Sequence, residues 1–484
     1  MRQVFCFGAA ALAGAAGLAP ADCSGLYTAQ ILYTEIPGHP TAQAPGTGGQ
    51  EFTAFLSLYT SPNGHNWICK GFVGASIDVI FAGTDETGSV VAIEGGATAI
   101  PGTTHSFVDS DCGINDAGQY AYGSRLLGAT TLTDEVIFYY DGATESAAVV
   151  ESDAAPGLFD PDGAGNELFG NSLNSTHVLN DGTVCFKADL IQNINSAYES
   201  ALYQGSTVVS QEGTNAAEGE VIDGYIGLSG DTFSSSPDGS VWIVEADIDP
   251  SISSQEAVLV NNEVKLHDGG TLPGSALAID AVFAVDVDNA GHWFARGDFT
   301  DDTDWVVRDG AVIAMTGTPI TTGNAETWGD AIAAMNGHDN DYLLAGNTSN
   351  PDTNLDSVLV LNGETVIARE GDVIALDGST NVAISSFSPE DVALTDDGRV
   401  LAFVILRDPD TGASLGDAFI EWIPVAGCNA ADLAEPCGVL DLADVTAFIA
   451  GFLGQDPIAD LDGNGIWDLL DVQAFISAFL NGCP

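Results

Sequence analysis

The chain has 484 residues, of which 69 are Asp or Glu and only 10 are Lys or Arg, so its formal net charge is −59. With so few cations to neutralise phosphates, the composition weighs strongly against nucleic acid as a partner. Because 45% of the residues are hydrophobic and the mean hydropathy is positive, the acidity belongs to the surface of a folded protein, where salty surroundings or bound cations would relieve the self-repulsion.

The first 21 residues are predicted to be a signal peptide. A basic start is followed by an apolar run over residues 4–18 and by Ala19-Pro20-Ala21, an Ala-x-Ala cleavage site. A short core helix is the alternative, but it would not explain the small residues at both critical positions. We therefore expect a secreted or cell-surface protein. No other run of 18 apolar residues occurs, so no transmembrane span is expected.

The cysteines of an exported chain stand in an oxidising compartment. Without Cys6, which falls in the signal peptide, seven remain, so at least one thiol stays unpaired. Cys185 lies in an apolar run and is expected to be a small buried hydrophobe. Cys428 and Cys483 are expected to form a disulfide, because they stand at the two ends of the C-terminal segment. The pairing of the others stays open: Cys23, Cys69, Cys112, Cys185 and Cys437.

Residues 22–427 contain seven copies of one pattern. A Gly, Asn and Asp turn leads each time into an apolar strand, and further short apolar runs follow, which gives four strands per roughly 50 residues. This spacing is typical of a propeller blade, so the predicted fold is mainly β, a seven-bladed β-propeller. In the sixth copy Asn340 takes the place of the usual Gly. The seven turns are residues 62–64, 116–118, 180–182, 237–239, 289–291, 338–340 and 396–398.

The last copy ends early, at residues 417–423, without its final strand. The N-terminal run over residues 27–33 is similar to that missing strand. An open ring would leave strand edges unpaired. We therefore expect the segment near Gln30 to Tyr33 to pair with the last copy and close the ring.

The repeats resemble a known group of secreted proteins. They carry the pattern Asn-x-x-Gly-x-x-x-Phe, followed by a strand that ends in residues 369–372, Arg-Glu-Gly-Asp. This pattern resembles the tandem-repeat proteins of planctomycete-type bacteria, which share interchangeable C-terminal anchors. The resemblance covers residues 22–427, and it implies no activity for the repeat itself.

From residue 428 to 484 the composition changes to helical runs between Asp-rich loops. The loop over residues 460–471 places side-chain oxygens at positions 1, 3, 5, 9 and 12 and a Gly at position 6, which is the EF-hand arrangement for the hard cation calcium. The carbonyl of Ile466 would supply position 7. The predicted side-chain ligands of this stronger calcium site are Asp460, Asp462, Asn464, Asp468 and Asp471.

An earlier copy of the loop and helix lies upstream, which indicates a tandem duplication. Asp441 matches Asp468, and Asp444 matches Asp471. The first loop begins at Asp432, is one residue longer, and has Ala and Pro where two oxygen ligands are needed. Calcium at this first loop is therefore expected to be weak or absent.

Two loop–helix repeats at the end of a secreted chain resemble a dockerin. Cys428 together with Gly482-Cys483-Pro484 is similar to the Gly-Cys-ended dockerins of planctomycetes. The resemblance covers residues 428–484. It implies calcium as the cofactor and a cohesin-type module, on a scaffold or a cell surface, as the partner.

Recognisable catalytic motifs are missing from the sequence, including a Gly-x-Ser-x-Gly elbow, a P-loop and a zinc-protease helix. His65, His292 and His338 each follow a Gly near a blade turn, so equivalent surface positions explain them better than metal ligation. Two functions stay open. The favoured one is a noncatalytic propeller that recognises extracellular material such as polysaccharide; the other is a polysaccharide-degrading enzyme. Three or more acids facing an aromatic at one propeller mouth would favour the enzyme.

Overall fold

The computed structural model describes residues 27–159, 163, 165–191, 198–214, 221–225, 233–248, 255–425, 431–434, 440–455, 457–461 and 466–482. The predicted signal peptide, Cys23, Cys437, both ends of the predicted disulfide, Asp462 and Asn464 lie outside these residues. The chain divides into two compact units. The larger one is Ala29–Ile423, and the other contains both C-terminal helices.

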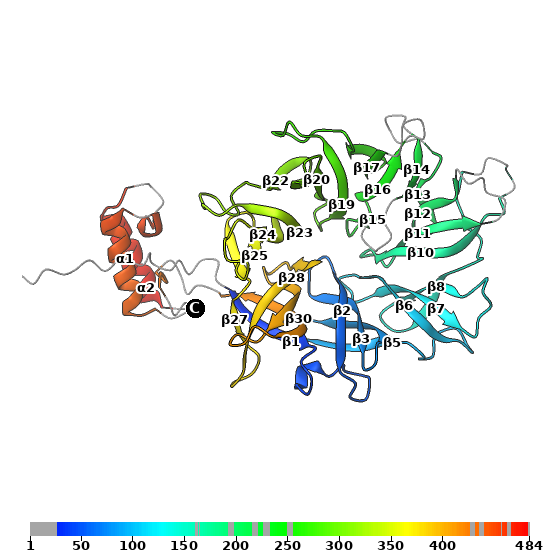
Figure 1. Ribbon diagram of the computed structural model, residues 1–484, viewed down its shortest axis with the longest axis horizontal. Helices are drawn as coiled ribbons and strands as arrows, with labels where there is room; N and C mark the ends of the chain where they lie inside the picture. Colours follow the sequence, from blue (N-terminus) through cyan, green and yellow to red (C-terminus); the bar gives the residue numbers. More distant parts are fainter. Residues whose placement is uncertain are drawn as a thin grey trace, which may run out of the picture. The chain divides into compact units, whose positions relative to one another are not determined.

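The larger unit is a seven-bladed β-propeller, with seven antiparallel sheets around a central axis (Figure 1). Its first three blades contain β2 (Phe52–Thr60), β3 (Asn66–Val73), β4 (Ile77–Thr84) and β5 (Thr87–Ile93); β6 (Thr104–Ile114), β7 (Tyr120–Leu127), β8 (Glu135–Tyr140) and β9 (Glu145–Val150); and β10 (Leu168–Val178), β11 (Val184–Ile191), β12 (Ser200–Gln204) and β13 (Thr207–Gln211). In the fourth blade β14 (Ile222–Tyr225) and β15 (Phe233–Ser235) both pair with β16 (Trp242–Ile248), and β17 (Gln255–Val260) and β18 (Glu263–His267) follow.

The remaining blades complete the ring. The fifth and sixth contain β19 (Ile279–Val287), β20 (Trp293–Phe299), β21 (Asp304–Arg308) and β22 (Ala311–Met315); and β23 (Trp328–His338), β24 (Asp341–Thr348), β25 (Ser357–Leu361) and β26 (Thr365–Arg369). The seventh contains β27 (Val373–Ala375), β28 (Asn381–Leu394), β29 (Val400–Arg407), β30 (Ser414–Pro424) and the N-terminal β1 (Tyr27–Thr34). A short 3-10 helix, η1 (Pro40–Ala42), precedes β2.

The ring is closed by the first strand of the chain, as the sequence predicts. β1 pairs with β30, so it is the outer strand of the seventh blade. Just beyond the pairing, the N–H of Glu35 donates to the carbonyl of Asp417 at 2.9 Å. The side chain of Tyr33 in β1 packs in the core between the last and first blades. Its ring centroid lies 4.8 Å from that of Phe81 and 6.1 Å from that of Trp67.

The hydrophobic core lies between neighbouring blades. Six clusters of buried side chains each draw on two successive blades. The inner strands of a blade are therefore covered on both faces, which is why an apolar run such as Trp67-Ile68, fully buried at both residues, replaces the alternation of a half-exposed strand. Cys185 is fully buried, as expected, and Cys69, Cys112 and Cys185 are free thiols.

The recurring turn follows the innermost strand of each blade, and it also links one blade to the next. The N–H of Asn63 donates to Asp116 Oδ1 at 2.9 Å, and the N–H of Asp116 donates to Asn180 Oδ1 at 3.1 Å. Gly supplies the left-handed backbone in these turns, as at Gly64. The sixth turn is different from the prediction, because Asp339 and not Asn340 takes the positive φ in a tighter hairpin.

The C-terminal unit contains α1 (Leu442–Gly454), a short 3-10 helix η3 (Pro457–Ala459) and α2 (Leu469–Asn481). The two long helices pack through equivalent phenylalanines, Phe448 and Phe475, whose rings stack with centroids 4.3 Å apart. Ala431 and Ala459 precede the two loops at equivalent places, and both are fully buried. Within the described residues, no helix is long and apolar enough to cross a membrane.

Candidate functional site

Both C-terminal helices begin with the same Asp-based cap. Asp441 and Asp468 are the N-cap residues, and each accepts a backbone N–H two residues later. In return, the carboxylates of Asp444 and Asp471 accept hydrogen bonds from the backbone N–H groups of the two cap residues, at 2.8 and 2.9 Å. These are capping boxes with Asp in place of Glu. Four of the residues predicted as calcium ligands therefore also define where the helices start.

The first loop is held by Asp444 through hydrogen bonds from the backbone. Asp444 Oδ1 accepts the N–H groups of Leu433 and Ala434 at 2.8 and 2.9 Å, and its side chain is fully buried. With the N–H of Asp441 on its other oxygen, the carboxylate has three backbone donors. Protein donors thus surround the carboxylate that a calcium ion would use in this loop.

The second loop keeps the predicted acids near the start of α2. Asp471 is fully buried, Asp460 is partly buried, and the side chain of Ile466 is exposed, so only its carbonyl is suited to a ligand role. A buried carboxylate at loop position 12, with further hard oxygen donors in the same loop, fits calcium. Asp468 and Asp471 are brought together by the capping box.

Each C-terminal helix leaves an apolar stripe exposed. The stripe residues stand at positions i, i+7 and i+11, which places them on one face of a helix. The two stripes are equivalent under the duplication, and all six side chains are about half or more exposed. On α1 the stripe is Leu442, Ile449 and Leu453; on α2 it is Leu469, Ile476 and Leu480.

The propeller contains a central cavity of about 210 Å³, lined by the innermost strands of the seven blades. Most polar lining residues come from the third to sixth blades, with Thr60 and Ser61 from the first. Apolar lining residues include Leu58 of the first blade and Leu394 of the seventh. These polar residues could not be predicted from the sequence, because they come from several repeats and no local motif joins them. The polar lining includes His177, Ser234, Ser235, Asp286 and Asn336.

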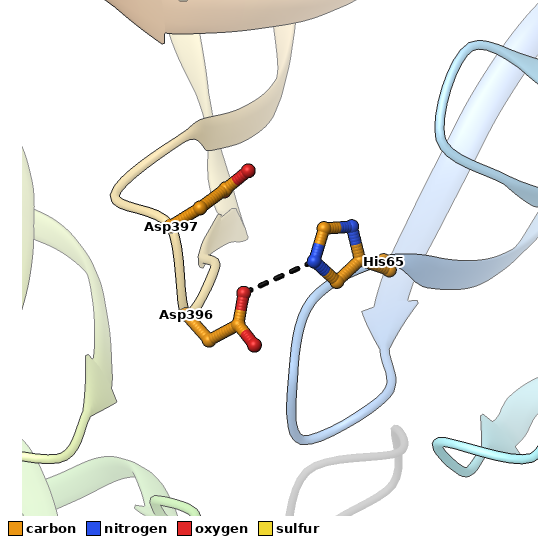
Figure 2. Close-up of side chains that lie close together, drawn as sticks. All are labelled: His65, Asp396 and Asp397. Atoms are coloured by element: carbon orange, nitrogen blue, oxygen red, sulfur yellow. Dashed lines mark hydrogen bonds and ion pairs between the residues drawn. The ribbon is translucent and has the colours of Figure 1, made fainter.

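A charged cluster joins the first and last blades. His65 Nε2 lies 3.0 Å from Asp396 Oδ1 (Figure 2). His65 Nδ1 lies 2.8 Å from Asp85 Oδ1. The hydrogen bond to Asp85 raises the pKa of His65. Arg399 donates to the same Asp85 oxygen at 2.9 Å, so a cation already neutralises this cluster. The cluster, which also includes Asp397, therefore fits a closure contact better than a metal site.

The predicted equivalence of three histidines holds for two of them. His292 Nδ1 lies 2.6 Å from Asp309 Oδ2, which repeats the contact between His65 and Asp85 in another blade. His338 is different, because it ends the inner strand β23 and is only 8% exposed. The tighter sixth turn moves His338 from the surface position into the strand.

Some of the few cations of the propeller form buried or partly buried ion pairs. Lys70 forms a buried ion pair with Asp78 at 3.2 Å, and Arg308 lies 3.4 Å from Asp288. Glu245 is almost fully buried without such a partner among the described residues. Its burial, and then the nearby Glu256 and Asp247, raise the pKa of Glu245 to about 7.

Glu245→Gln should therefore stabilise the protein at pH 8 and change its stability little at pH 5. The folded pKa of Glu245 lies above the unfolded value of about 4.3, so its contribution to wild-type stability is full below that value and is lost as pH rises through about 7. Urea unfolding at both pH values measures the difference. Glu364→Gln, at an exposed position, is the control and should change the free energy of unfolding by the same amount at both pH values. A Glu245→Gln variant that is no more stable than wild type at pH 8 would contradict the assignment.

No protein-family model matches the chain, and no curated protein does. Among solved structures, Sqt1 of Saccharomyces cerevisiae is similar over 87% of this chain and 91% of its own, with 9% identity and a TM-score of 0.33. BBS1N, in complex with ARL6DN, is 10% identical over 82% of this chain and 98% of its own, also with a TM-score of 0.33. Prolyl oligopeptidase B from Galerina marginata is 11% identical over 75% of this chain and 50% of its own, with a TM-score of 0.33. Likenesses this distant carry no argument about function. The sheets and helices themselves establish a seven-bladed β-propeller followed by two helices.

Proposed function

We propose that the protein is a secreted or cell-surface, noncatalytic propeller that recognises extracellular material and is tethered by a dockerin. In this proposal the C-terminal unit docks, with bound calcium, onto a cohesin-type partner. The observation that carries the proposal is the pair of equivalent apolar stripes on α1 and α2, together with their twin Asp caps. Exposed, ordered apolar helix faces are typical of protein-binding modules.

The charge of the C-terminal unit supports a partner of complementary chemistry. Residues 428–484 contain nine Asp or Glu and no Lys, Arg or His. A partner surface that offers an apolar patch with basic residues around it would match both the stripes and this charge. Calcium bound in the second loop would also lower the local negative charge.

Calcium is assigned to the second loop only. Its ligands would be Asp460, Asp462, Asn464, Asp468, Asp471 and the carbonyl of Ile466, and it would supply rigidity to the loop before α2. The first loop has Ala434 and Pro436 where two oxygen ligands are needed, and three backbone N–H groups already donate to the Asp444 carboxylate. Asp432, Asp441 and Asp444 are therefore assigned a weak site or none.

The central cavity supports recognition over the alternative of a polysaccharide-degrading enzyme. Among the described residues, two acids line it, Asp286 and Asp288. Asp288 Oδ1 accepts the N–H groups of Ala290 and His292 at 2.9 and 2.8 Å, so it serves as a turn cap. Two free carboxylates placed on either side of a glycosidic bond are what hydrolysis requires, and the described lining of the cavity does not offer them.

The stripes give a direct test with the full-length chain and a panel of cohesin modules. Because the stripes are equivalent, Leu453→Ser or Leu480→Ser alone should leave binding within a few-fold of wild type, whereas both together should weaken it by at least tenfold. Leu132→Ser, at an exposed leucine of the propeller, is the control and should have no effect. Biosensor binding that is unchanged in the double variant would exclude the stripes as the docking surface.

A further inference from the structure

The fourth blade carries three acids on one face of its sheet, Glu245 and Asp247 of β16 and Glu256 of β17. The register between the two strands is regular, and it pairs Asp247 with Glu256 and Glu245 with Val258. Because side chains alternate along a strand and register partners share a face, the three carboxylates lie on the same face as Val258. Val258 packs in the core cluster formed with the fifth blade, so this face is turned toward that blade.

Glu245 is the most deeply buried of the three acids. It is only 5% exposed, and no hydrogen bond or ion pair joins it to another of the described residues. The charges that act on it are those of Glu256 and Asp247, and both are negative. Glu256 reaches the fifth blade, where its Oε2 accepts the N–H of Val282 at 3.3 Å. A buried carboxylate among like charges is costly without a counter-ion.

The first blade has an ammonium group at the equivalent position. Lys70 follows its blade turn by the same number of residues as Glu245. Asp78 is the equivalent of Glu256, because each pairs with the residue two places further along the second strand of its blade. Lys70 Nζ lies 3.2 Å from Asp78 Oδ1, and both side chains are buried. The other five blades have uncharged residues at this position, namely Ser124, Ala188, Gly297, Gly346 and Val404.

The neighbouring blade also covers the acids less than it covers Lys70. In the second blade the ring of Phe107 lies over the Lys70 ammonium, with its centroid 4.0 Å from Nζ. Phe107 pairs with Arg125, and the equivalent pair in the fifth blade is Ala281 with Asp298. A methyl group therefore stands where the second blade has an aromatic ring, so less apolar bulk lies over the acids.

We propose that the contact between the fourth and fifth blades binds a calcium ion through the carboxylates of Glu245, Asp247 and Glu256. The ion would supply the positive charge that Lys70 supplies in the first blade. Carboxylates bind calcium through one or both oxygens, and water would complete its set of about six to eight ligands. Because two of the acids are only partly buried, we expect a dissociation constant on the order of 10⁻⁴–10⁻³ M, the range of extracellular modules. This weaker site goes beyond the docking proposal and does not depend on it.

Urea unfolding of the full-length chain at pH 8, followed by tryptophan fluorescence, tests the site. Every chain carries Asp471→Asn, which removes the ligand set of the C-terminal loop. Sodium chloride keeps the ionic strength equal between about 10 mM calcium and chelator. Calcium should raise the urea midpoint of the parent chain and leave that of Glu245→Gln nearly unchanged. Since Glu245→Gln should be the more stable chain in chelator, its lack of response would not come from misfolding.

Glu245→Lys provides the converse test, because it reproduces the arrangement of the first blade. This variant should unfold at a higher urea concentration than the parent in chelator and should no longer respond to calcium. Asp247→Asn keeps the buried carboxylate and should reduce the response. Glu364→Gln, at an exposed position, is the control and should respond to calcium as the parent does.

Two results would overturn the assignment. A calcium shift of the same size in the parent, Glu245→Gln and Glu245→Lys would come from diffuse binding to the acidic surface. No shift in the parent chain would mean that the acids of the fourth blade do not hold an ion.

Discussion

Calcium should bind the full-length chain at one tight site, and Asp471→Asn should weaken that binding more than tenfold while Asp444→Asn leaves it nearly unchanged. The two residues are equivalent caps and are equally buried, so the pair is matched in structure. They differ in their loops, because the first loop has Ala434 and Pro436 where the second has two of its oxygen ligands. Calorimetry after removal of divalent ions, in enough salt to suppress diffuse binding to the acidic surface, measures the effect.

Both carboxylates also accept the N–H of their cap residue, so stability measured without calcium gives a second comparison. Asp444→Asn should lower the stability of the C-terminal unit, because hydrogen bonds to a charged group contribute about 1.5–3 kcal/mol each. Calcium should raise the melting temperature of wild type and of Asp444→Asn, and much less that of Asp471→Asn. Equal loss of calcium binding in the two variants would mean that both loops bind the ion.

Removing the Tyr33 side chain should be among the most destabilising changes in the propeller. Tyr33→Ala is expected to cost about 3–5 kcal/mol, the usual range for an aromatic in a packed core. Its ring contacts Phe52, Trp67 and Phe81 of the first blade, so it attaches β1 of the seventh blade to the first. Tyr33→Phe keeps the ring but removes the acceptor of the Gly88 N–H, and should cost about 1 kcal/mol.

Urea unfolding of the full-length chain measures both Tyr33 variants. Leu132→Ala, at a leucine that is 65% exposed, is the control and should change stability by less than about 0.5 kcal/mol. If Tyr33→Ala cost no more than this control, β1 would not be holding the ring closed.

Most of the propeller could be predicted from its period. Seven turns fix seven blades, and a last copy without a final strand requires a strand from elsewhere, which β1 supplies. Contacts between blades could not be predicted in the same way. The inner strands contain β-bulges, as between Val282 and Ala284, and each bulge changes which side chains face the next blade. The contact between Ser234 and Asp286 depends on those shifts.

The C-terminal unit was predictable for a different reason. An Asp followed three residues later by another Asp, before an apolar run, is a local capping signal, and it occurs at Asp441 and at Asp468. What the sequence does not contain is the use of Asp444 as an acceptor for Leu433 and Ala434. That contact spans the whole first loop and depends on its folded path.

The most direct test of the account is docking of the full-length chain onto immobilised cohesin modules over a series of buffered calcium concentrations. The account predicts that docking appears together with the occupancy of the single site at Asp460–Asp471 and disappears when calcium is chelated. Equal docking with and without chelator, or no docking to any cohesin at saturating calcium, would contradict it.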